Sequence, residues 1–150
     1  MAADSSSSPS TPRVLRVLLD TNVVLDWLLD RKPWSDDAAP LWQARDTGRL
    51  ITYISASAVT DIFYIARRQI GTAAALASID QSLALEIAPV GKETLLRART
   101  LPGNDFEDNV AIACADVERL DFIVTRNTAD FGHSPVPAFE PLALLPYLPA

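Results

Sequence analysis

The segment from Val14 to Trp27 (VLRVLLDTNVVLDW) constrains the fold more than any other part of the chain. Its first half is a run of mostly branched apolar residues with little alternation, which is typical of a strand covered on both faces. The run stops at Asp20, and apolar residues then return at helical spacings, as at Val23 and Val24. Asp20 therefore stands at the carboxyl end of a buried strand, which is where ligands bind in open α/β sheets.

The rest of the chain alternates short apolar runs with stretches of helical periodicity. We predict strands over residues 50–54, 85–90 and 122–125 and a short strand near residues 138–139, with helices between them. This alternation predicts an α/β fold whose mostly parallel sheet is covered by helices on both faces. Because right-handed crossovers bring the carboxyl ends of such strands to one edge, the loop after each strand is the place to look for chemistry.

Length and composition set the expected domain organisation. The chain has 150 residues, so we expect a single domain over residues 13–150, preceded by a disordered Ser/Pro-rich tail over residues 1–12. A lone cysteine, Cys114, rules out an internal disulfide and suits a reducing compartment. No apolar run is long enough to cross a bilayer and no secretory signal is recognisable, so the expected location is the cytoplasm, without membrane contact.

The net charge of −6 restricts how the protein could bind nucleic acid. Nucleic-acid-binding proteins usually present a basic face. If nucleic acid is the partner here, metal ions or a local arginine group must neutralise its phosphates. A basic partner protein, or arginines that only cover helix surfaces, would fit the composition equally well. The arginines that could form such a group are Arg67, Arg68, Arg97, Arg99 and Arg126.

Polar side chains collect at four places along the predicted edge. These are Asp20-Thr21-Asn22, the helix start with Ser57 and Asp61, the segment Asn104-Asp105-Phe106-Glu107-Asp108, and Thr125-Arg126-Asn127 with Asp130 beyond it. Asp61 lies at the rim of an apolar helix stripe, where it can reach a cleft or simply face solvent. Ser57 is suited to cap that helix.

Asp105 and Asp108 are neighbours on one helix side, where they raise each other's pKa unless a cation lies between them. The alternative is that they serve only the helix dipole, as many first-turn acids do. Asn104 and Glu107 fit a capping box. The core stripe of this helix is predicted to comprise Phe106, Val110, Ala113, Cys114 and Val117, with Ile112 and Ala115 on the opposite side.

Elimination leaves an oxygen-ligand metal site as the favoured chemistry. The chain has one histidine, His133, and one cysteine, which excludes the usual zinc site within one chain and disfavours a Ser-His-Asp or Cys-His mechanism. No glycine-rich phosphate loop is present. Three to five carboxylates with Ser, Thr and Asn nearby suit Mg²⁺ or Mn²⁺, and a water on such an ion can hydrolyse a phosphodiester.

Three quoted segments resemble the motifs of the PIN-domain nuclease family. LLDTNVVLDWLL is similar to its opening motif, SASAVTDIFYIARR to its second acidic segment, and DFEDNVAIACADVERLDFIVTRNTADF to its third and fourth, in the branch with DFED and TRN. The resemblance implies an α/β/α sandwich, Mg²⁺ or Mn²⁺, and cleavage of single-stranded RNA. It also implies a VapC-like toxin of a bacterial toxin–antitoxin system, a small antitoxin partner and a homodimer.

The resemblance assigns roles by position. Asp20, Asp61 and Asp108 match the metal-binding acids, although Asp61 falls where many members have Glu. Asp105 is a close neighbour that would assist. Asn127 falls where many members carry a fourth Asp, which weakens a second metal position.

Further residues complete the expected site. Asp130 or Asp105 is a candidate to compensate for Asn127. Asn22 and Thr125 match polar residues that orient ligands or phosphate, and we expect Ser57 and Asn127 to act in the same way.

Two other functions compete with the nuclease. One is a binding or regulatory protein that kept the fold and has little or no nuclease activity, which the shortened Asp61 and the amide at Asn127 motivate. The other is a receiver-like or phosphatase-like domain with Asp20 as nucleophile. The second is disfavoured because no aspartate follows two residues after Asp20, and because neither lysine, Lys32 or Lys92, lies near a late strand end.

Overall fold

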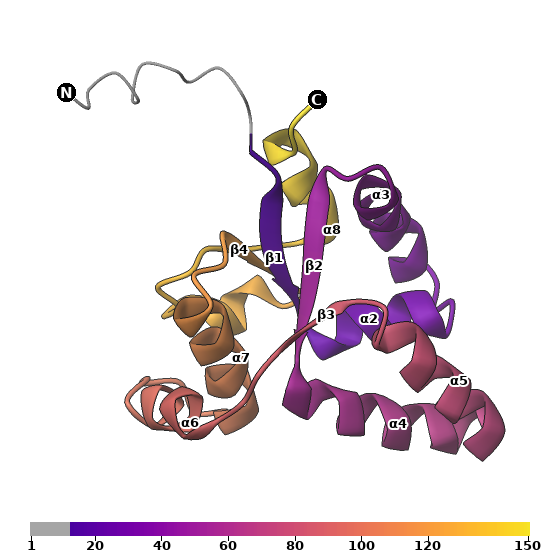
Figure 1. Cartoon of the computed structure of the whole chain (residues 1–150), viewed down its shortest axis with the longest axis horizontal. Helices are drawn as coiled ribbons and strands as arrows, with labels where there is room; N and C mark the ends of the chain where they lie inside the picture. The colour runs from indigo at the N-terminus through magenta and orange to yellow at the C-terminus, as the bar shows by residue number, and fades with distance from the viewer. Residues whose placement is uncertain (1–12) are drawn as a thin grey trace.

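A computed structural model describes residues 13–150, and its centre is a five-stranded parallel sheet with the strand order β3-β2-β1-β4-β5. Helices cover both faces of the sheet (Figure 1), which confirms the predicted α/β/α architecture. The predicted tail, residues 1–12, lies outside the described residues. The elements are β1 (Leu15–Leu19), α2 (Thr21–Leu28), α3 (Trp34–Asp46), β2 (Leu50–Ser55), α4 (Ala56–Ile70), α5 (Thr72–Ser82), β3 (Glu86–Ala88), α6 (Lys92–Arg99), α7 (Phe106–Val117), β4 (Phe122–Val124), η1 (Thr128–Phe131), β5 (Ala138–Phe139), α8 (Pro141–Leu144) and η2 (Leu145–Tyr147).

The strands are added to the sheet first on one side of β1 and then on the other. From β1 the chain moves outward through β2 to β3, and it then returns to place β4 and β5 on the other side of β1. Leu15 of β1 pairs with Leu50 of β2, and Val17 of β1 pairs with Phe122 of β4. The switch point therefore lies between the carboxyl ends of β1 and β4. In open α/β sheets this crevice is where ligands bind.

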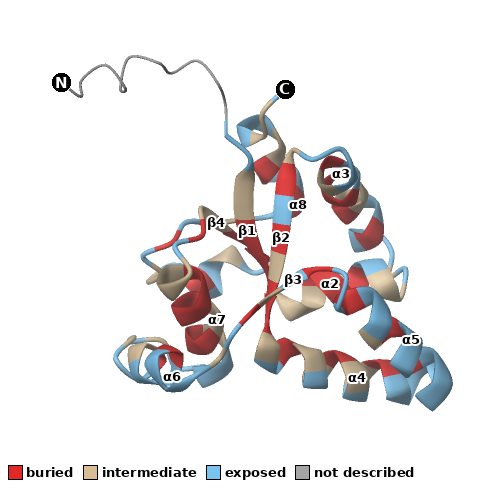
Figure 2. Cartoon of the chain, in the orientation of Figure 1, coloured by how far each residue is buried: buried red, intermediate tan, exposed pale blue. Residues whose placement is uncertain are grey.

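The core has two parts because β1 is buried on both faces. Val17 and Leu19 pack with the apolar sides of α2 and α3, together with residues of β2 and α4. Leu18 points to the opposite face and packs with residues of α6 and α7. Figure 2 shows the buried positions on the sheet and on the inward sides of these helices, with exposed positions on the outer turns. The uninterrupted apolar run in the sequence is thus explained by burial on both sides.

Two helix starts differ from the sequence predictions, whereas α2 begins directly after Asp20, as predicted. Asp20 is the N-cap of α2, and its carboxylate accepts from the Thr21 amide. Ser55, not Ser57, caps α4 by accepting from the amide of Ala58. The capping box predicted for α7 is also wrong: Asp105, one residue after Asn104, is the N-cap. A carboxylate or hydroxyl at the N-cap satisfies an amide that the first helical turn leaves unpaired.

The predicted core stripe of α7 is only partly correct. Val110, Ala113 and Cys114 are buried as predicted, but Phe106 is 50 % exposed. Ile112 and Ala115, which the sequence placed on the opposite side, are fully buried. Because α6 and the sheet both pack against α7, most of its circumference is covered. This helix therefore holds its first-turn acids on a firmly packed support.

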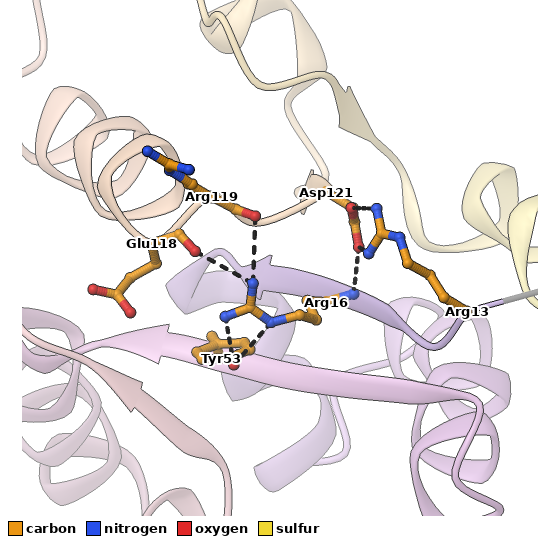
Figure 3. Close-up of polar contacts among 6 residues, drawn as sticks. All are labelled: Arg13, Arg16, Tyr53, Glu118, Arg119 and Asp121. Carbon is orange, nitrogen blue, oxygen red and sulfur yellow. Dashed lines mark hydrogen bonds and ion pairs between the residues drawn. The ribbon is translucent and has the colours of Figure 1, made fainter. Parts of the chain in front are cut away.

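A polar network ties β1 to the far end of α7, away from the carboxyl edge of the sheet (Figure 3). The Arg16 guanidinium donates to the Tyr53 hydroxyl at 3.0 and 3.2 Å and to the backbone carbonyls of Glu118 and Arg119 at 3.4 Å. Asp121 accepts from the Arg16 amide at 2.8 Å and from the Arg13 guanidinium. Arg16 thus satisfies carbonyls that the end of α7 leaves unpaired.

Within residues 13–150, the structure contains no helix that is both long and apolar enough to cross a membrane.

Candidate metal-binding active site

A cavity of about 490 Å³ opens at the carboxyl ends of the strands, beside the switch point. Six carboxylic acids line it, together with two asparagines, two serines, an exposed tyrosine and one arginine. The acids come from segments far apart in the sequence: Asp20, Asp61, Asp105, Glu107, Asp108 and Asp130. A site with this composition attracts cations and repels anions unless a cation is bound.

Asp20 is fixed directly at the switch point. Its backbone amide donates to the carbonyl of Val124 at 2.9 Å, which joins the ends of β1 and β4. One carboxylate oxygen accepts from the Thr21 amide and the other from the Thr125 hydroxyl, each at 2.9 Å. Burial raises the pKa of Asp20, while these two hydrogen bonds oppose the rise. The carboxylate is therefore oriented before any ligand arrives.

Asp105 and Asp108 lie at the start of α7. Asp105 caps the helix by accepting from the Asp108 amide at 3.1 Å. Burial and the negative charges of Asp105, Asp20 and Asp130 raise the pKa of Asp108 from 3.8 to about 6. Carboxylates that perturb one another in this way lie close enough to interact electrostatically. The sequence prediction that Asp105 and Asp108 would repel each other is consistent with this shift.

Asp61 reaches the cavity from α4. A hydrogen bond with Asp61, together with the negative charge of Asp61, raises the pKa of Glu107. Two ionised carboxylates this close repel each other, and a bound cation would relieve that repulsion. The sequence assigned Glu107 to a capping box, so its place beside Asp61 was missed. The only available signal was the unusual density of acids in DFED.

Eight of the nine residues predicted for the site line this cavity: Asp20, Asn22, Ser57, Asp61, Asp105, Asp108, Asn127 and Asp130. Thr125, the ninth, lies fully buried beneath it. The Thr125 hydroxyl donates to Asp20 and accepts from the backbone amide of Asn127 at 3.1 Å. It therefore links the end of β4, Asp20 and the loop that carries Asn127.

Arg126 does not face the cavity, contrary to the suggestion that it could meet phosphate. Its Nε lies 2.9 Å from a carboxylate oxygen of Asp26, which is 1 % exposed. The Nε of Arg31 lies 2.9 Å from the other oxygen, and Arg31 also donates to the backbone and side-chain oxygens of Asn22 at 3.3 Å. The Arg126 guanidinium stacks 4.0 Å from the ring centroid of Trp34. Asp26 thus pairs with two arginines, one from the turn after α2 and one from the loop after β4.

The remaining candidate arginines are distributed differently. Arg97 pairs with Asp116 at 2.8 Å, on the α6–α7 side. Arg67 lies over the ring of Tyr64, 5.2 Å from its centroid. Arg99 is exposed on α6, and the cavity's lining does not include it. Arg68 is the single cationic side chain among the described residues that line the cavity.

The loop before α7 is held by close packing around Gly103. A Cβ at this position would lie 2.5 Å from Cε1 of His133 and 2.6 Å from the side-chain oxygen of Asn109. Asn109 donates to the carbonyl of Gly103 at 2.9 Å, and His133 Nε2 lies 3.1 Å from its Oδ1. His133 therefore serves this packing, and the absence of a side chain at Gly103 lets the loop approach.

The donor set fits a hard divalent cation, although the acids are not yet gathered around one point. Within residues 13–150, no three side chains are grouped tightly enough to form a finished metal site. Yet three acids of the cavity, Asp20, Glu107 and Asp108, have raised pKa values because their charges are buried or lie near one another. All available ligands are oxygens, as Mg²⁺ and Mn²⁺ prefer. A bound cation would remove the repulsion and draw the carboxylates together.

The sequence over residues 16–129 matches the PIN domain family. The chain belongs to the PIN-domain family. No curated protein sequence matches it significantly. Among solved structures, it is similar to a DNA-bound VapBC from Salmonella typhimurium, with a TM-score of 0.68 and 17 % identity over 85 % of this chain and 99 % of the other.

Two further solved structures share the fold of this PIN domain. A toxin–antitoxin complex from Klebsiella pneumoniae has a TM-score of 0.65 and 22 % identity, covering 83 % of this chain and 97 % of that one. VapC20 of Mycobacterium tuberculosis, a toxin that cleaves the sarcin–ricin loop, has a TM-score of 0.59 and 14 % identity, covering 71 % and 86 %. The match to the PIN domain family over residues 16–129 confirms the resemblance inferred from the motifs.

Proposed function

We propose that this PIN-domain protein is a Mg²⁺- or Mn²⁺-dependent endoribonuclease of the cytoplasm that cleaves single-stranded RNA. The proposal rests on one observation above all: six acids from four segments line one cavity at the switch point of the sheet. Asp20, Asp61 and Asp108 would hold the metal, with Asp105 and Asp130 assisting. When bound, the metal supplies an activated water and neutralises charge on the scissile phosphate.

The chain's own residues prepare the site for this reaction. Thr125 holds one oxygen of Asp20, so the other acids can converge on a carboxylate of fixed orientation. The raised pKa of Asp108 means that a proton competes with a cation, so affinity for metal should rise as the pH increases through about 6. Asn22, Ser57 and Asn127 offer an amide or hydroxyl donor each to the phosphate or to water.

We further propose that the protein is the toxin of a type II toxin–antitoxin pair, bound by a small antitoxin and forming a homodimer. Support comes from the fold shared with a toxin–antitoxin complex from Klebsiella pneumoniae and with VapBC from Salmonella typhimurium. Membership of the DFED/TRN branch stays a prediction from the motifs. Co-purification with the product of a neighbouring small gene, and light scattering of the isolated protein, test the antitoxin and the dimer respectively.

The competing proposal is a PIN-fold binding or regulatory protein with little nuclease activity. It is favoured by Asn127, which lines the cavity and brings an amide where many family members carry a carboxylate. Asp130, three residues further on, lines the same cavity and can replace the missing charge. We therefore rank the nuclease first.

The deciding experiment incubates antitoxin-free protein with end-labelled single-stranded RNA in Mn²⁺, in Mg²⁺ and in EDTA. We expect cleavage with either metal and none in EDTA. Asp20→Asn should abolish cleavage while its circular dichroism spectrum stays that of the parent protein. Full activity of Asp20→Asn, or activity that EDTA leaves unchanged, would reject the metal-dependent mechanism, whereas no cleavage of any RNA would favour the regulatory alternative.

A further inference from the structure

One side of α4 forms a continuous wall of the acidic cavity. The residues on this wall are Ser57, Asp61, Tyr64, Ile65 and Arg68, at the spacings of three and four that place them on one helix stripe. Since an α-helix rises 1.5 Å per residue, the wall runs for about 16 Å from Ser57 to Arg68. In Figure 1, α4 leads away from the carboxyl end of β2. The cavity therefore extends about 10 Å beyond Asp61, away from the acids that would hold metal.

Tyr64 presents an open aromatic surface on this wall. The residue is 52 % exposed and lines the cavity. Phe63 meets the ring edge-on at 5.1 Å, and the Arg67 guanidinium lies 5.2 Å from the ring centroid. Arg67 thus lies over one face of the ring and Phe63 meets it edge to face, while half of the residue stays open. An exposed aromatic ring is a platform on which a nucleobase can stack.

Arg68 lies one helical turn beyond Tyr64 and carries the positive charge that the rest of the cavity lacks. Its side chain is exposed, and no hydrogen bond or ion pair engages it among the described residues. Arg126, by contrast, is held by Asp26, and Arg67 by the aromatic rings. A free guanidinium beside an aromatic ring can hold a phosphate while the adjoining base stacks.

We propose that Tyr64 and Arg68 form a nucleotide subsite for the single-stranded RNA, one that stacks a base on Tyr64 and binds a phosphate with Arg68. This inference rests on the proposed ribonuclease function and identifies where the strand leaves the acid cluster. The subsite holds a nucleotide beyond the cleaved phosphodiester, because about 10 Å of helix separates Arg68 from Asp61. It also explains how an acidic protein binds RNA, because the metal would neutralise the charge of one phosphate and Arg68 the charge of another.

The test measures binding separately from cleavage. Fluorescence anisotropy of a labelled oligouridine of about 12 nucleotides is followed with proteins that also carry Asp20→Asn, so that the RNA stays intact. Tyr64→Ala and Arg68→Ala should each weaken binding about tenfold. Tyr64→Phe, which keeps the ring, should bind like the parent. Arg99→Ala, which removes an exposed arginine on α6 outside the cavity, is the matched control and should also bind like the parent.

Two readouts distinguish the roles of the two residues. Loss of one phosphate contact reduces the slope of log affinity against log salt by about 0.7, so Arg68→Ala should show this reduction and Tyr64→Ala should not. Scanning a single abasic position along the oligonucleotide should reveal one position where the parent loses affinity and Tyr64→Ala loses none. In proteins with Asp20 intact, both alanine variants should raise KM for the oligonucleotide and leave kcat within about twofold.

The outcomes separate this inference from the proposed function. If the parent cleaves RNA and both alanine variants bind and cleave as it does, the subsite is wrong and the nuclease stands. Equal weakening by Arg99→Ala would also overturn it, because the effect would then be one of general charge. If the parent neither binds nor cleaves any RNA, the ribonuclease and its subsite fall together. Unchanged melting temperatures of the exposed-residue variants exclude misfolding as the cause.

Discussion

Replacing Asp108 by asparagine should stabilise the metal-free protein, although it removes a proposed metal ligand. The substitution keeps the size of the side chain and removes a charge that faces Asp105, Asp20 and Asp130. Burial and these charges raise the pKa of Asp108 from 3.8 to about 6, so the folded protein prefers the neutral form. Neutral asparagine does not suffer this repulsion.

The magnitude follows from the pKa. Each tenfold change in a proton-binding constant corresponds to about 1.4 kcal/mol, so ionised Asp108 costs the fold at most about 3 kcal/mol. The side chain is only half-buried, and water screens part of the repulsion, so about 1 kcal/mol is the expected gain for Asp108→Asn. For a protein of this length, that gain raises the melting temperature by about 3 °C.

The pH dependence has a definite sign. Because the folded-state pKa of Asp108 is raised, its destabilising charge is absent below about pH 4, appears as the pH rises, and is fully present above about 6. Thermal unfolding in EDTA should therefore show Asp108→Asn more stable than the parent at pH 7.5 and equal to it near pH 4. Adding Mn²⁺ should raise the melting temperature of the parent more than that of the variant.

A control separates this effect from a general loss of negative charge. Asp80→Asn removes an exposed carboxylate on α5, away from the cavity, and should change the melting temperature little at either pH. If Asp108→Asn melts at or below the parent temperature in EDTA at pH 7.5, the claim that the acids of the cavity repel each other is refuted. The metal site would then lose its physical basis.

Three further predictions concern residues that hold the site or the fold. Thr125→Val should lower Mn²⁺ affinity measured by calorimetry, because Asp20 loses the hydroxyl that orients it, and should cost stability by about 1 kcal/mol; unchanged affinity would argue against positioning by Thr125. Burial raises the pKa of Asp26, but unlike Asp108 this carboxylate faces two cations. Asp26→Asn should therefore destabilise the fold by about 3 kcal/mol in urea, since it leaves two arginines without a buried counter-charge; an unaltered urea midpoint would contradict this. Burial alone would raise the pKa of Asp121, but hydrogen bonds from Arg13 and the Arg16 amide lower it. The stabilising contribution of the Asp121 carboxylate is therefore present above about pH 4 and is lost as the pH falls further. Asp121→Asn should weaken the loss of stability at acid pH, and an unchanged loss would refute the stabilising role of Asp121.

The fold was predictable because its signals are local. The apolar run before Asp20 and the helical spacing after it are properties of adjacent residues, and they place Asp20 at a strand end without further information. The pleat and the helix period then determine which side chains face the sheet. The short strand near Ala138 and Phe139 was also predicted, and it is β5 of the structure.

Contacts between distant segments were less predictable. The pairing of Glu107 with Asp61 depends on how α4 and α7 approach each other, and nothing in the spacing of either segment encodes that approach. The polar neighbours Thr125 and Asn127 suggested that Arg126 could bind phosphate. In the structure, Arg126 instead pairs with Asp26 of α2. Which acids bind metal remains a prediction that the cavity makes testable.

The carboxylate of Asp26 has a consequence for how this protein can vary. Arg31, which donates to the cavity residue Asn22, and Arg126, which precedes the cavity residue Asn127, both pair with this buried carboxylate, and Trp34 stacks on Arg126. Neither arginine can move away on its own without leaving a charge unmatched inside the protein. Substitutions at Asp26, Arg31 and Arg126 should therefore be tolerated only when they occur together, so that these positions change jointly during evolution.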